Sequence, residues 1–565
     1  MSKKTKYGHL SREQLEAKLE KLERERYGLV WEDKEEDVAK QCETELPVLK
    51  EDNSREIISN PTGVHNFIIE GDNFHSLYTL NFTHKKKIDV IYIDPPYNTG
   101  NKSWKFNNAY IDKEDRFKHS KWISFMNKRL RLSKQLLKKE GVIICAIDDY
   151  ELADLKLLLD IIFGEQNRLG TCVVVHNPGG RQDEKFFPTS HEYMLVYAKD
   201  INYAKIGTLS VSKDKQLQYK LKDDLGNYKL RGFRRSGANS RKEDRPNLYY
   251  PIYFEEATKK LSTAPIPKAI SLLPIDEKGI ERCWRWNAET FEKKKNQYIE
   301  SKKVKGQIQL YVKERESDNK GEKPKSIWNK PKYAAVGGTS ILKNIFNTTD
   351  KIFDYPKSLS LLFDVLDITT NKNSIVLDFF AGSGTTGQAV LELNKDGGNR
   401  QFILCTNNEN SICEEVTYPR IKKVIEGYAD HKGIPANVKY YKQTFVPNVT
   451  SDKDKRELVS RSTELLCMAE DTFENVIKRS PKDEFAAFKN ATKQTVIIYD
   501  EESIDKCVNK LNEIYLRLET VIYVFSYDHT YDTEDFKNLN IEFSVKPIPE
   551  AILNVYRKIA KIRKK

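Results

Sequence analysis

Four consecutive residues, Asp94, Pro95, Pro96 and Tyr97, could bind a flat group that carries an amine. The Asp94 carboxylate and the Pro95 carbonyl oxygen can both accept a hydrogen bond from an NH2 group. The ring of Tyr97 can stack on the face of the same group. Two prolines in series cannot donate to a sheet or enter a helix, so they end any regular element here. An exposed turn is the alternative interpretation of the same residues.

A buried strand must position this motif. Residues 90–93 form a continuous apolar run, which is typical of a strand that is covered on both faces. Asp94 and Tyr97 would then lie at the carboxyl end of a central strand. Open α/β sheets bind their ligands at that end.

A second strand and turn lie far along the chain. Residues 375–377 predict a strand, Gly382 and Gly384 a tight turn, and 386–393 a helix. Glycine allows the backbone to approach a ligand closely at such a turn. Together with Gly387 the two glycines also fit G-x-G-x-x-G, and Glu409 follows about twenty residues later, as in dinucleotide-binding folds. A phosphate-binding P-loop is disfavoured because no lysine follows the glycines.

Asp-Pro-Pro-Tyr at 94–97, taken with Phe-Ala-Gly-Ser-Gly-Thr-Thr at 380–386, resembles the amino-methyltransferases that modify DNA with S-adenosylmethionine. In that family the first motif binds the target base and the second binds the cofactor. Their order here resembles the beta class, and the layout resembles the modification (Mod) subunit of Type III restriction–modification systems. The resemblance covers roughly residues 60–445.

This resemblance implies an α/β, Rossmann-like S-adenosylmethionine-dependent methyltransferase fold, circularly permuted as in the beta class. It also implies an inserted target-recognition domain and a small C-terminal α/β domain. The expected divisions are an N-terminal helical and charged arm (1–60), a first methyltransferase segment with the base motif (61–199), the target-recognition domain (200–336), a second methyltransferase segment with the cofactor motif (337–449) and the C-terminal domain (450–565). By the same resemblance, the last domain would serve dimerisation or docking of a partner.

The resemblance also implies roles for individual residues. Asp72 would approach the adenine amine of the cofactor, although it could equally cap a helix. Lys357 would meet the methionine carboxylate, or else be exposed. Glu409 would bond the ribose hydroxyls, although the strand end carries Thr406 and Asn407 where many relatives have an acid. The remaining cofactor contacts are expected from the glycine segment, at Asp378, Phe379, Phe380, Gly382, Gly384 and Thr385.

Two segments are expected to contact DNA. The first is a polar, aromatic-bearing loop at 98–110, where little looks buriable and where Asn101, Lys102 and Trp104 suit contact with phosphates and an unstacked base. The second is the basic stretch 200–336, which lies between the two motifs, as target-recognition regions do in the beta class. A solvated basic surface is the alternative. The candidate DNA-binding residues of the stretch 200–336 are Arg231, Arg234, Arg235, Arg241, Lys242 and Arg245.

Composition agrees with this interpretation and argues against a zinc-binding, a membrane-spanning and a secreted protein. Among 565 residues, 95 Lys and Arg against 83 Asp and Glu give a net charge of +12, which suits a polyanion-binding protein. The eight cysteines contain no C-x-x-C pair, which argues against structural zinc and indicates a reduced, cytoplasmic setting. The sequence contains no run of eighteen apolar residues, and its start lacks a signal-peptide core.

The predicted reaction is methyl transfer from S-adenosylmethionine to the N6 amine of an adenine flipped out of double-stranded DNA. Asp94, Pro95, Pro96 and Tyr97 would be catalytic, and no metal would be needed. Aspartate at the first position favours adenine N6 over cytosine N4. Three alternatives remain: a cytosine-N4 methyltransferase, a dinucleotide-dependent oxidoreductase built on the glycine turn, and a catalytically silent DNA-binding subunit. Expected partners are DNA, a second copy in a homodimer, and a restriction subunit supplying helicase and nuclease activity.

Overall fold

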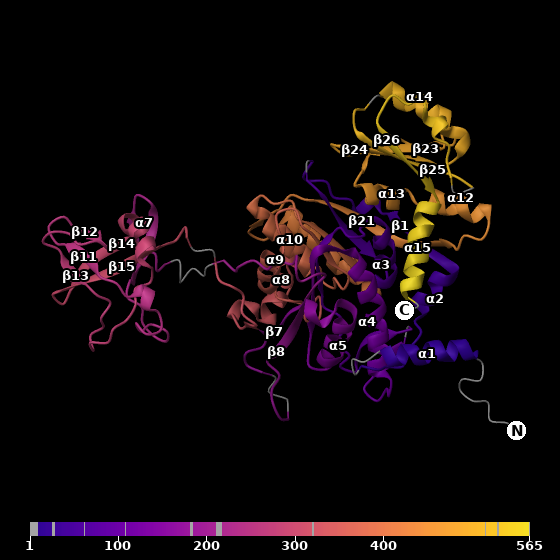
Figure 1. Cartoon of the computed structure of the whole chain (residues 1–565). Coiled ribbons are helices and arrows are strands. Elements are labelled where there is room, and N and C mark those ends of the chain that lie inside the picture. The colour runs from indigo at the N-terminus through magenta and orange to yellow at the C-terminus, as the bar shows by residue number, and fades with distance from the viewer. Residues whose placement is uncertain are drawn as a thin grey trace. The chain divides into compact units, whose positions relative to one another are not determined.

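The computed structural model describes residues 10–24, 29–61, 63–107, 109–180, 185–210, 217–318, 321–514, 516–527 and 530–563, excluding the side chains of 21–24, 101–103, 533 and 562–563. The chain forms two compact units. The larger comprises Met1–Gly207 and Lys325–Lys565, and the smaller is Thr208–Pro324. Figure 1 labels many of their helices and strands.

A ten-stranded sheet runs through the larger unit (Figure 1). The neighbouring strands β21, β2, β18, β17, β3 and β6 run parallel to one another. Strands β1, β8 and β7 are each antiparallel to a neighbour. In spatial order the strands are β1 (Glu45–Glu51), β21 (Asn437–Pro447), β2 (His65–Glu70), β18 (Gln401–Thr406), β17 (Ile375–Asp378), β3 (Ile88–Ile93), β6 (Leu137–Ile147), β8 (His191–Ala198), β7 (Arg168–Val175) and β16 (Ile327–Trp328).

The strand that precedes Asp94 lies directly beside the strand that precedes the glycine turn. β3 pairs in parallel with β17, with Val90 opposite Val376. Every residue of β3 is buried, as its continuous apolar run predicts. Because neighbouring parallel strands end at the same edge of a sheet, the two motifs lie side by side although they are far apart in sequence. The predicted Rossmann-like α/β methyltransferase fold is confirmed.

Helices cover both faces of this sheet. Ile91 and Ile93 of β3 belong to the core that also contains α3, α4 and α5, whereas the alternate residues Val90 and Tyr92 face the other side. Among the described residues, no helix is long and apolar enough to cross a bilayer. The described helices of the larger unit before its C-terminal region are α1 (Arg12–Arg24), α2 (Asp37–Thr44), α3 (Asn73–Thr83), α4 (Lys118–Leu136), α5 (Leu152–Phe163), α8 (Ala335–Phe346), α9 (Leu359–Thr369), α10 (Thr385–Leu393) and α11 (Tyr418–Glu426).

The N-terminal arm belongs to the fold. Residues 37–51 form α2 and β1, and β1 is the outermost strand of the sheet, antiparallel to β21. Leu46, Val48 and Leu49 are buried there. The expectation of a merely helical and charged arm was incomplete, because a short apolar strand is set among acidic and polar residues.

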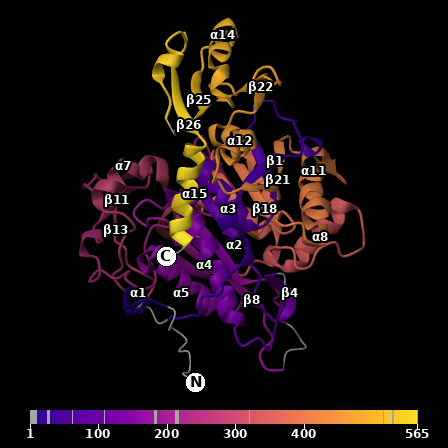
Figure 2. The same ribbon diagram turned by 90° about the vertical axis from the view of Figure 1, so that its right-hand side faces the viewer.

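The C-terminal region packs onto the catalytic fold instead of standing apart. The Tyr556 hydroxyl donates to the Pro47 carbonyl oxygen at 2.7 Å, and the Tyr78 hydroxyl donates to the Tyr556 carbonyl oxygen at 3.2 Å. α15, yellow in Figure 2, runs beside α3 and α4. The elements of this region are α12 (Asp452–Ser460), α13 (Thr463–Glu470), a five-stranded sheet of β22 (Glu474–Ile477), β23 (Phe485–Lys489), β24 (Lys493–Ile498), β25 (Glu519–Phe525) and β26 (Phe543–Ile548), α14 (Ile504–Ile514) and α15 (Glu550–Arg563).

The segment that follows Tyr97 is a β-hairpin, so the expectation of a loop with little to bury was wrong. β4 (Asn101–Phe106) pairs with β5 (Ala109–Asp112). Trp104, Phe106 and Ile111 are buried, and the Trp104 ring lies 5.2 Å from that of Phe125 on α4. These side chains of the hairpin pack against the domain and are not presented to solvent.

The smaller unit has its own core and narrower bounds than the expected segment 200–336. Residues 200–207 and 325–336 belong to the larger unit, where the Gly207 amide donates to Ile368 and β16 pairs with β7. Phe233, Trp284 and Phe291 are buried in the smaller unit. Its elements are β9 (Leu221–Asp223), β10 (Gly226–Gly232), β11 (Ile252–Glu255), β12 (Lys260–Ser262), β13 (Ile270–Leu272), α7 (Ala288–Tyr298), β14 (Ile299–Val304) and β15 (Gln307–Arg315).

Candidate active site

The Asp94–Tyr97 motif is fixed at the end of β3 by its own hydrogen bonds. The Tyr97 hydroxyl donates to Asp94 Oδ1 at 2.8 Å. Trp122 of α4 donates from its indole nitrogen to the Pro96 carbonyl oxygen at 2.6 Å. The Asp94 side chain keeps about a quarter of its surface exposed (27%) and so can meet a ligand.

Lys357 binds this motif from the other half of the catalytic fold. Its ammonium group lies 3.2 Å from Asp94 Oδ1 and 2.5 Å from Glu192 Oε2, and it also contacts the Tyr97 hydroxyl. The role expected for Lys357 was contact with a methionine carboxylate, whereas its contacts here are with the base motif. Sequence reasoning missed Glu192. The signal that could have found it is a lone acid in an otherwise apolar and aromatic strand, β8.

The charges of this cluster depend on one another. Burial raises the pKa of Asp94, Lys357 opposes that shift, and Glu192 adds to it. Burial alone would lower the pKa of Lys357, but the two carboxylates raise it by more. The lysine is therefore held in its charged form between two acids.

Asp378 braces the glycine turn from within. Its Oδ1 accepts from the Phe380 amide at 3.0 Å and its Oδ2 accepts from the Thr386 hydroxyl at 2.5 Å. Burial raises the pKa of Asp378 to about 7. Gly384 has φ +77°, which favours glycine, and a Cβ there would lie 3.3 Å from the side chain of Thr417. Thr385 begins α10 directly after this turn.

A buried arginine that sequence reasoning missed holds the same turn. Arg420 of α11 donates to the Ser383 carbonyl oxygen at 3.1 Å and to the Thr385 hydroxyl at 2.8 Å. Burial lowers the pKa of its guanidinium to about 9. The turn is thus bonded on one side by Asp378 and on the other by a buried cation.

A cavity of about 540 Å³ lies beside both motifs. Of the residues predicted to bind ligands, it brings together Asp72, Pro96, Trp104, Phe379, Phe380 and Glu409. The other lining residues are Glu36, Asp37, Val38, Asn73, Lys105, Phe106, Asn107, Phe125, Arg129, Thr406 and Asn407. Asp94, Tyr97, Lys357, Asp378, Gly382, Gly384 and Thr385 lie outside this lining.

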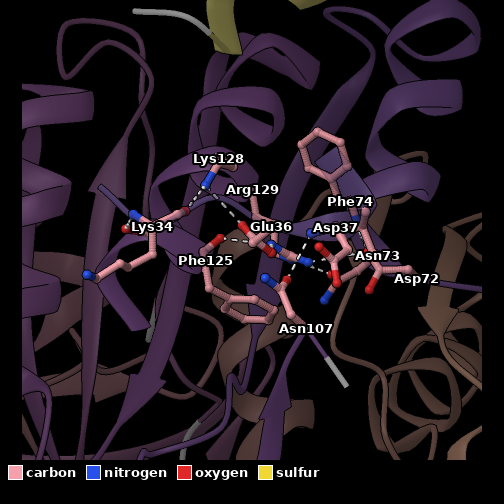
Figure 3. A network of polar contacts seen from close by, with 12 residues as sticks. Lys34, Glu36, Asp37, Asp72, Asn73, Phe74, Asn107, Phe125, Lys128 and Arg129 are labelled. Atoms are coloured by element: carbon pink, nitrogen blue, oxygen red, sulfur yellow. Dashed lines mark hydrogen bonds and ion pairs between the residues drawn. The ribbon is translucent and has the colours of Figure 1, made fainter. Parts of the chain in front are cut away.

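Arg129 joins the walls of the cavity (Figure 3). It is 1% exposed, and it donates to Glu36 at 2.8 Å, to Asn73 at 2.5 Å and to Asp72 at 3.3 Å. The side-chain amide of Asn73 donates in turn to the Phe379 carbonyl oxygen at 3.0 Å. Asp72 also accepts from the Phe74 amide at 2.7 Å as the N-cap of α3, so it both caps a helix and lines the cavity.

The hairpin forms one rim of the cavity. Lys105 of β4 forms an ion pair with Glu409, the residue expected to bond ribose. Trp104 is 7% exposed and donates from its indole nitrogen to Asn98 Oδ1 at 3.0 Å. Its ring therefore belongs to the wall and is not free to stack on an extruded base. The side chains of Asn101 and Lys102 lie outside the described residues.

The basic residues predicted to contact DNA are dispersed within the smaller unit. Arg231 pairs with Glu314 at 2.8 Å, and Lys242 pairs with Glu281 at 2.9 Å. The Arg234 guanidinium binds the Ile275 carbonyl oxygen, and the carbonyl oxygens of Arg241 and Arg245 accept from the Cys283 thiol. Arg231 and Arg235 also line a second cavity of about 800 Å³, together with Arg285, Trp286 and Lys294 among others.

Several known proteins are similar to this chain in sequence. The Type II methyltransferase M.KpnI of Klebsiella pneumoniae is 38% identical over 351 residues, which cover 62% of this chain and 82% of M.KpnI. The EcoPI Mod subunit of Escherichia phage P1 is 32% identical over 393 residues, covering 64% of this chain and 60% of that subunit. The StyLTI Mod subunit of Salmonella typhimurium is 29% identical over 429 residues, covering 68% of this chain and 59% of that subunit.

The chain thus spans less than two thirds of the length of the EcoPI and StyLTI Mod subunits. The family described as DNA methylase matches residues 88–418, a range that holds both the Asp94 motif and the glycine turn. With the cavity beside these two motifs, this match shows that the chain belongs to the DNA methylase family.

Proposed function

We propose that this protein is a site-specific methyltransferase that transfers the methyl group of S-adenosylmethionine to the N6 amine of adenine in double-stranded DNA. The observation that carries the proposal is that the strands before the Asp94 motif and before the glycine turn are paired, and that Pro96, Phe379 and Phe380 from the two segments line one cavity of about 540 Å³. Aspartate at the first motif position favours adenine N6. The similarity to the EcoPI and StyLTI Mod subunits supports a role in restriction and modification.

The cavity fits the cofactor. Phe125 and Phe380 offer apolar surface to a purine, and Asp72 and Glu409 offer carboxylates to an amine and to ribose hydroxyls. S-adenosylmethionine would supply an activated methyl group on its sulfonium. The glycine turn, held by Asp378 and Arg420, would let the backbone come close to the cofactor.

The chain's own residues would make the adenine amine a nucleophile. An exocyclic amine is a poor nucleophile because its lone pair is delocalised into the ring. Asp94 and the Pro95 carbonyl oxygen would accept from the two N–H groups, so that the lone pair points at the methyl group. Tyr97 would stack on the base. Positioning of this kind supplies most of the acceleration when the methyl donor is already activated.

The rest of the proposal concerns DNA and partners. A base inside a duplex cannot reach Asp94, so the target adenine must be flipped out. The smaller unit, with its arginines and lysines, would read the sequence. We further propose that the protein forms a homodimer and has a restriction subunit as its partner. Its proposed location is the cytoplasm.

Nucleoside analysis tests the reaction. The protein is incubated with S-adenosylmethionine labelled in its methyl group and with DNA of mixed sequence, and the DNA is then digested to nucleosides. Label in N6-methyladenine supports the proposal. Label in N4-methylcytosine establishes the second candidate, which the same site could serve. Unlabelled DNA together with tight NAD binding would rule out both methyltransferase candidates and support a dinucleotide-dependent oxidoreductase.

A further inference from the structure

We propose that Tyr97 and Glu192 form a proton relay that removes the proton of the methylated amine from Asp94, and that Lys357 holds the relay in place. The inference rests on the proposed methyl transfer and assigns further residues to it. Its central observation is one hydroxyl group between two carboxylates. Tyr97 Oη lies 2.8 Å from Asp94 Oδ1 and 3.0 Å from Glu192 Oε2.

The geometry allows a proton to pass through the hydroxyl. A phenol carries one proton and can donate to only one of the two acids at a time. When Asp94 is protonated, it can donate to Tyr97 Oη while Tyr97 donates to Glu192. Lys357 contacts all three groups, at 3.2 Å from Asp94 Oδ1 and 2.5 Å from Glu192 Oε2. Its ammonium fixes their separation.

The relay balances the reaction. The N6 lone pair forms the new N–C bond, the C–S bond breaks, and its electron pair stays on sulfur as a neutral thioether. The nitrogen is left with a positive charge and gives one proton to the Asp94 carboxylate. That proton moves to Tyr97 as the hydroxyl's own proton moves to Glu192. Asp94 is again a carboxylate, Tyr97 is neutral, and Glu192 releases the proton to water before the next turnover.

The charge count explains why a second acid is present. Asp94 paired with Lys357 alone would be a neutral pair and a weak base. Glu192 leaves the cluster with one net negative charge, which favours a cationic nitrogen and the capture of its proton. The Glu192 side chain is 7% exposed, so this charge is poorly screened by solvent. Among the described residues, Tyr92 on β3, Asp378 on β17 and Asp148 after β6 are further titratable groups that interact with the cluster.

A purely structural ion pair would show the same contacts, and the chain contains a control for it. In the C-terminal region, Glu470 is 8% exposed and accepts from the Tyr523 hydroxyl at 2.6 Å and from Lys546 at 2.9 Å. This cluster also combines a buried glutamate with a tyrosine and lysine, but it belongs to neither motif nor to the cavity beside them. Glu470→Gln therefore tests the loss of a buried acid without loss of a relay.

The experiment measures single-turnover methylation against pH for the wild-type protein and for Glu192→Gln, Tyr97→Phe and Glu470→Gln. Asp94 must be ionised, so the rate falls on the acid side. Loss of the Glu192 charge lowers the pKa of Asp94, so this acid limb moves to lower pH and the plateau falls about a hundredfold. Tyr97→Phe keeps the ring but removes a donor to the Asp94 carboxylate, so its acid limb moves to higher pH. Glu470→Gln leaves the limb in place.

Opposite limb shifts in Glu192→Gln and Tyr97→Phe, together with a lowered plateau in both, support the relay, because a changed Asp94 pKa alone would move the limb and leave the plateau. A wild-type profile in Glu192→Gln, or shifts in the same direction, overturns it. Lys357→Gln replaces Glu192→Gln in the experiment if that variant fails to fold. Its acid limb is expected at higher pH, because Asp94 loses its neighbouring cation. An unmoved limb in Lys357→Gln would count against the relay. Should the wild-type protein itself leave DNA unmethylated, the proposed function fails. If it methylates DNA and the variants match it, the relay alone fails.

Discussion

The side-chain amide of Asn98 donates a 2.5 Å hydrogen bond to the buried carboxyl group of Glu151. Asn98 directly follows Tyr97, and its Oδ1 accepts from the indole of Trp104. Glu151 therefore anchors both the end of the base motif and the start of the hairpin. Burial raises the pKa of Glu151 to about 9, and Asp154 contributes to the rise. Glu151 is protonated at neutral pH.

This raised pKa predicts how stability depends on pH. The folded-state pKa of about 9 exceeds the ordinary glutamate value of 4.5, so the stability from Glu151 is full below the lower value and is lost as pH rises through the higher one. Glu151→Gln keeps the neutral hydrogen bonds and cannot ionise. We expect the melting temperature of Glu151→Gln, measured by calorimetry, to rise relative to that of the wild-type protein as the pH increases from 5 to 9. A constant difference across that range would contradict the prediction.

Asp94→Ala should abolish methylation and spare cofactor binding. Asp94 would meet the target amine, and it lies outside the lining of the cavity. We expect single-turnover methylation to fall by more than about a hundredfold, the lower end of what positioned acid–base groups contribute. Titration calorimetry with S-adenosylmethionine measures the second half of the prediction. Near-normal turnover would refute the role of Asp94.

The glycine turn allows a matched comparison. Gly384 and Gly397 have φ values of +77° and +79°, so alanine strains the backbone equally at both. A Cβ at Gly384 would press on Thr417, whereas a Cβ at Gly397 meets nothing within 4 Å. We expect Gly384→Ala to weaken S-adenosylmethionine binding at least about tenfold and Gly397→Ala to leave it unchanged. Equal affinities in calorimetry would remove the turn from the cofactor site.

Exchange of residues 208–324 for the corresponding segment of a relative should change the sequence methylated while adenine stays the target. The exchange should follow these bounds and not 200–336, because Gly207 and the strand β16 are bonded into the larger unit. Sequencing of methylated sites in cells that express the hybrid gives the answer. An unaltered recognition site would place specificity elsewhere in the chain.

Within the smaller unit, Arg235 is the arginine to test first. It lines the cavity of about 800 Å³ together with Trp286. If Arg235 reads a base edge, alanine there should cost about 1–3 kcal/mol of discrimination at one base position. If it contacts phosphate, Arg235→Ala should weaken all DNA alike and reduce the salt dependence by about one unit of slope. Binding to cognate and altered DNA at several salt concentrations separates the two, and an unchanged variant contradicts both.

The two motifs and the strands that carry them could be predicted from the sequence. The reason is that their signals are local. An apolar run ended by Pro95 and Pro96 defines β3, and an apolar run followed by Gly382 and Gly384 defines β17. The Rossmann-like fold was implied by the family resemblance that these two motifs carry.

The partners of these motifs were decided by tertiary structure alone. Glu192 of β8 reaches Asp94 because the order of strands β3, β6 and β8 in the sheet brings their ends together, and no local pattern encodes that order. Lys357 reaches Asp94 from the segment before α9, a contact that no local pattern encodes either. Arg129 binds Glu36 and Asp72 across three elements for the same reason. Residue type and period give each strand and helix, whereas sheet order and side-chain direction determine which charges meet.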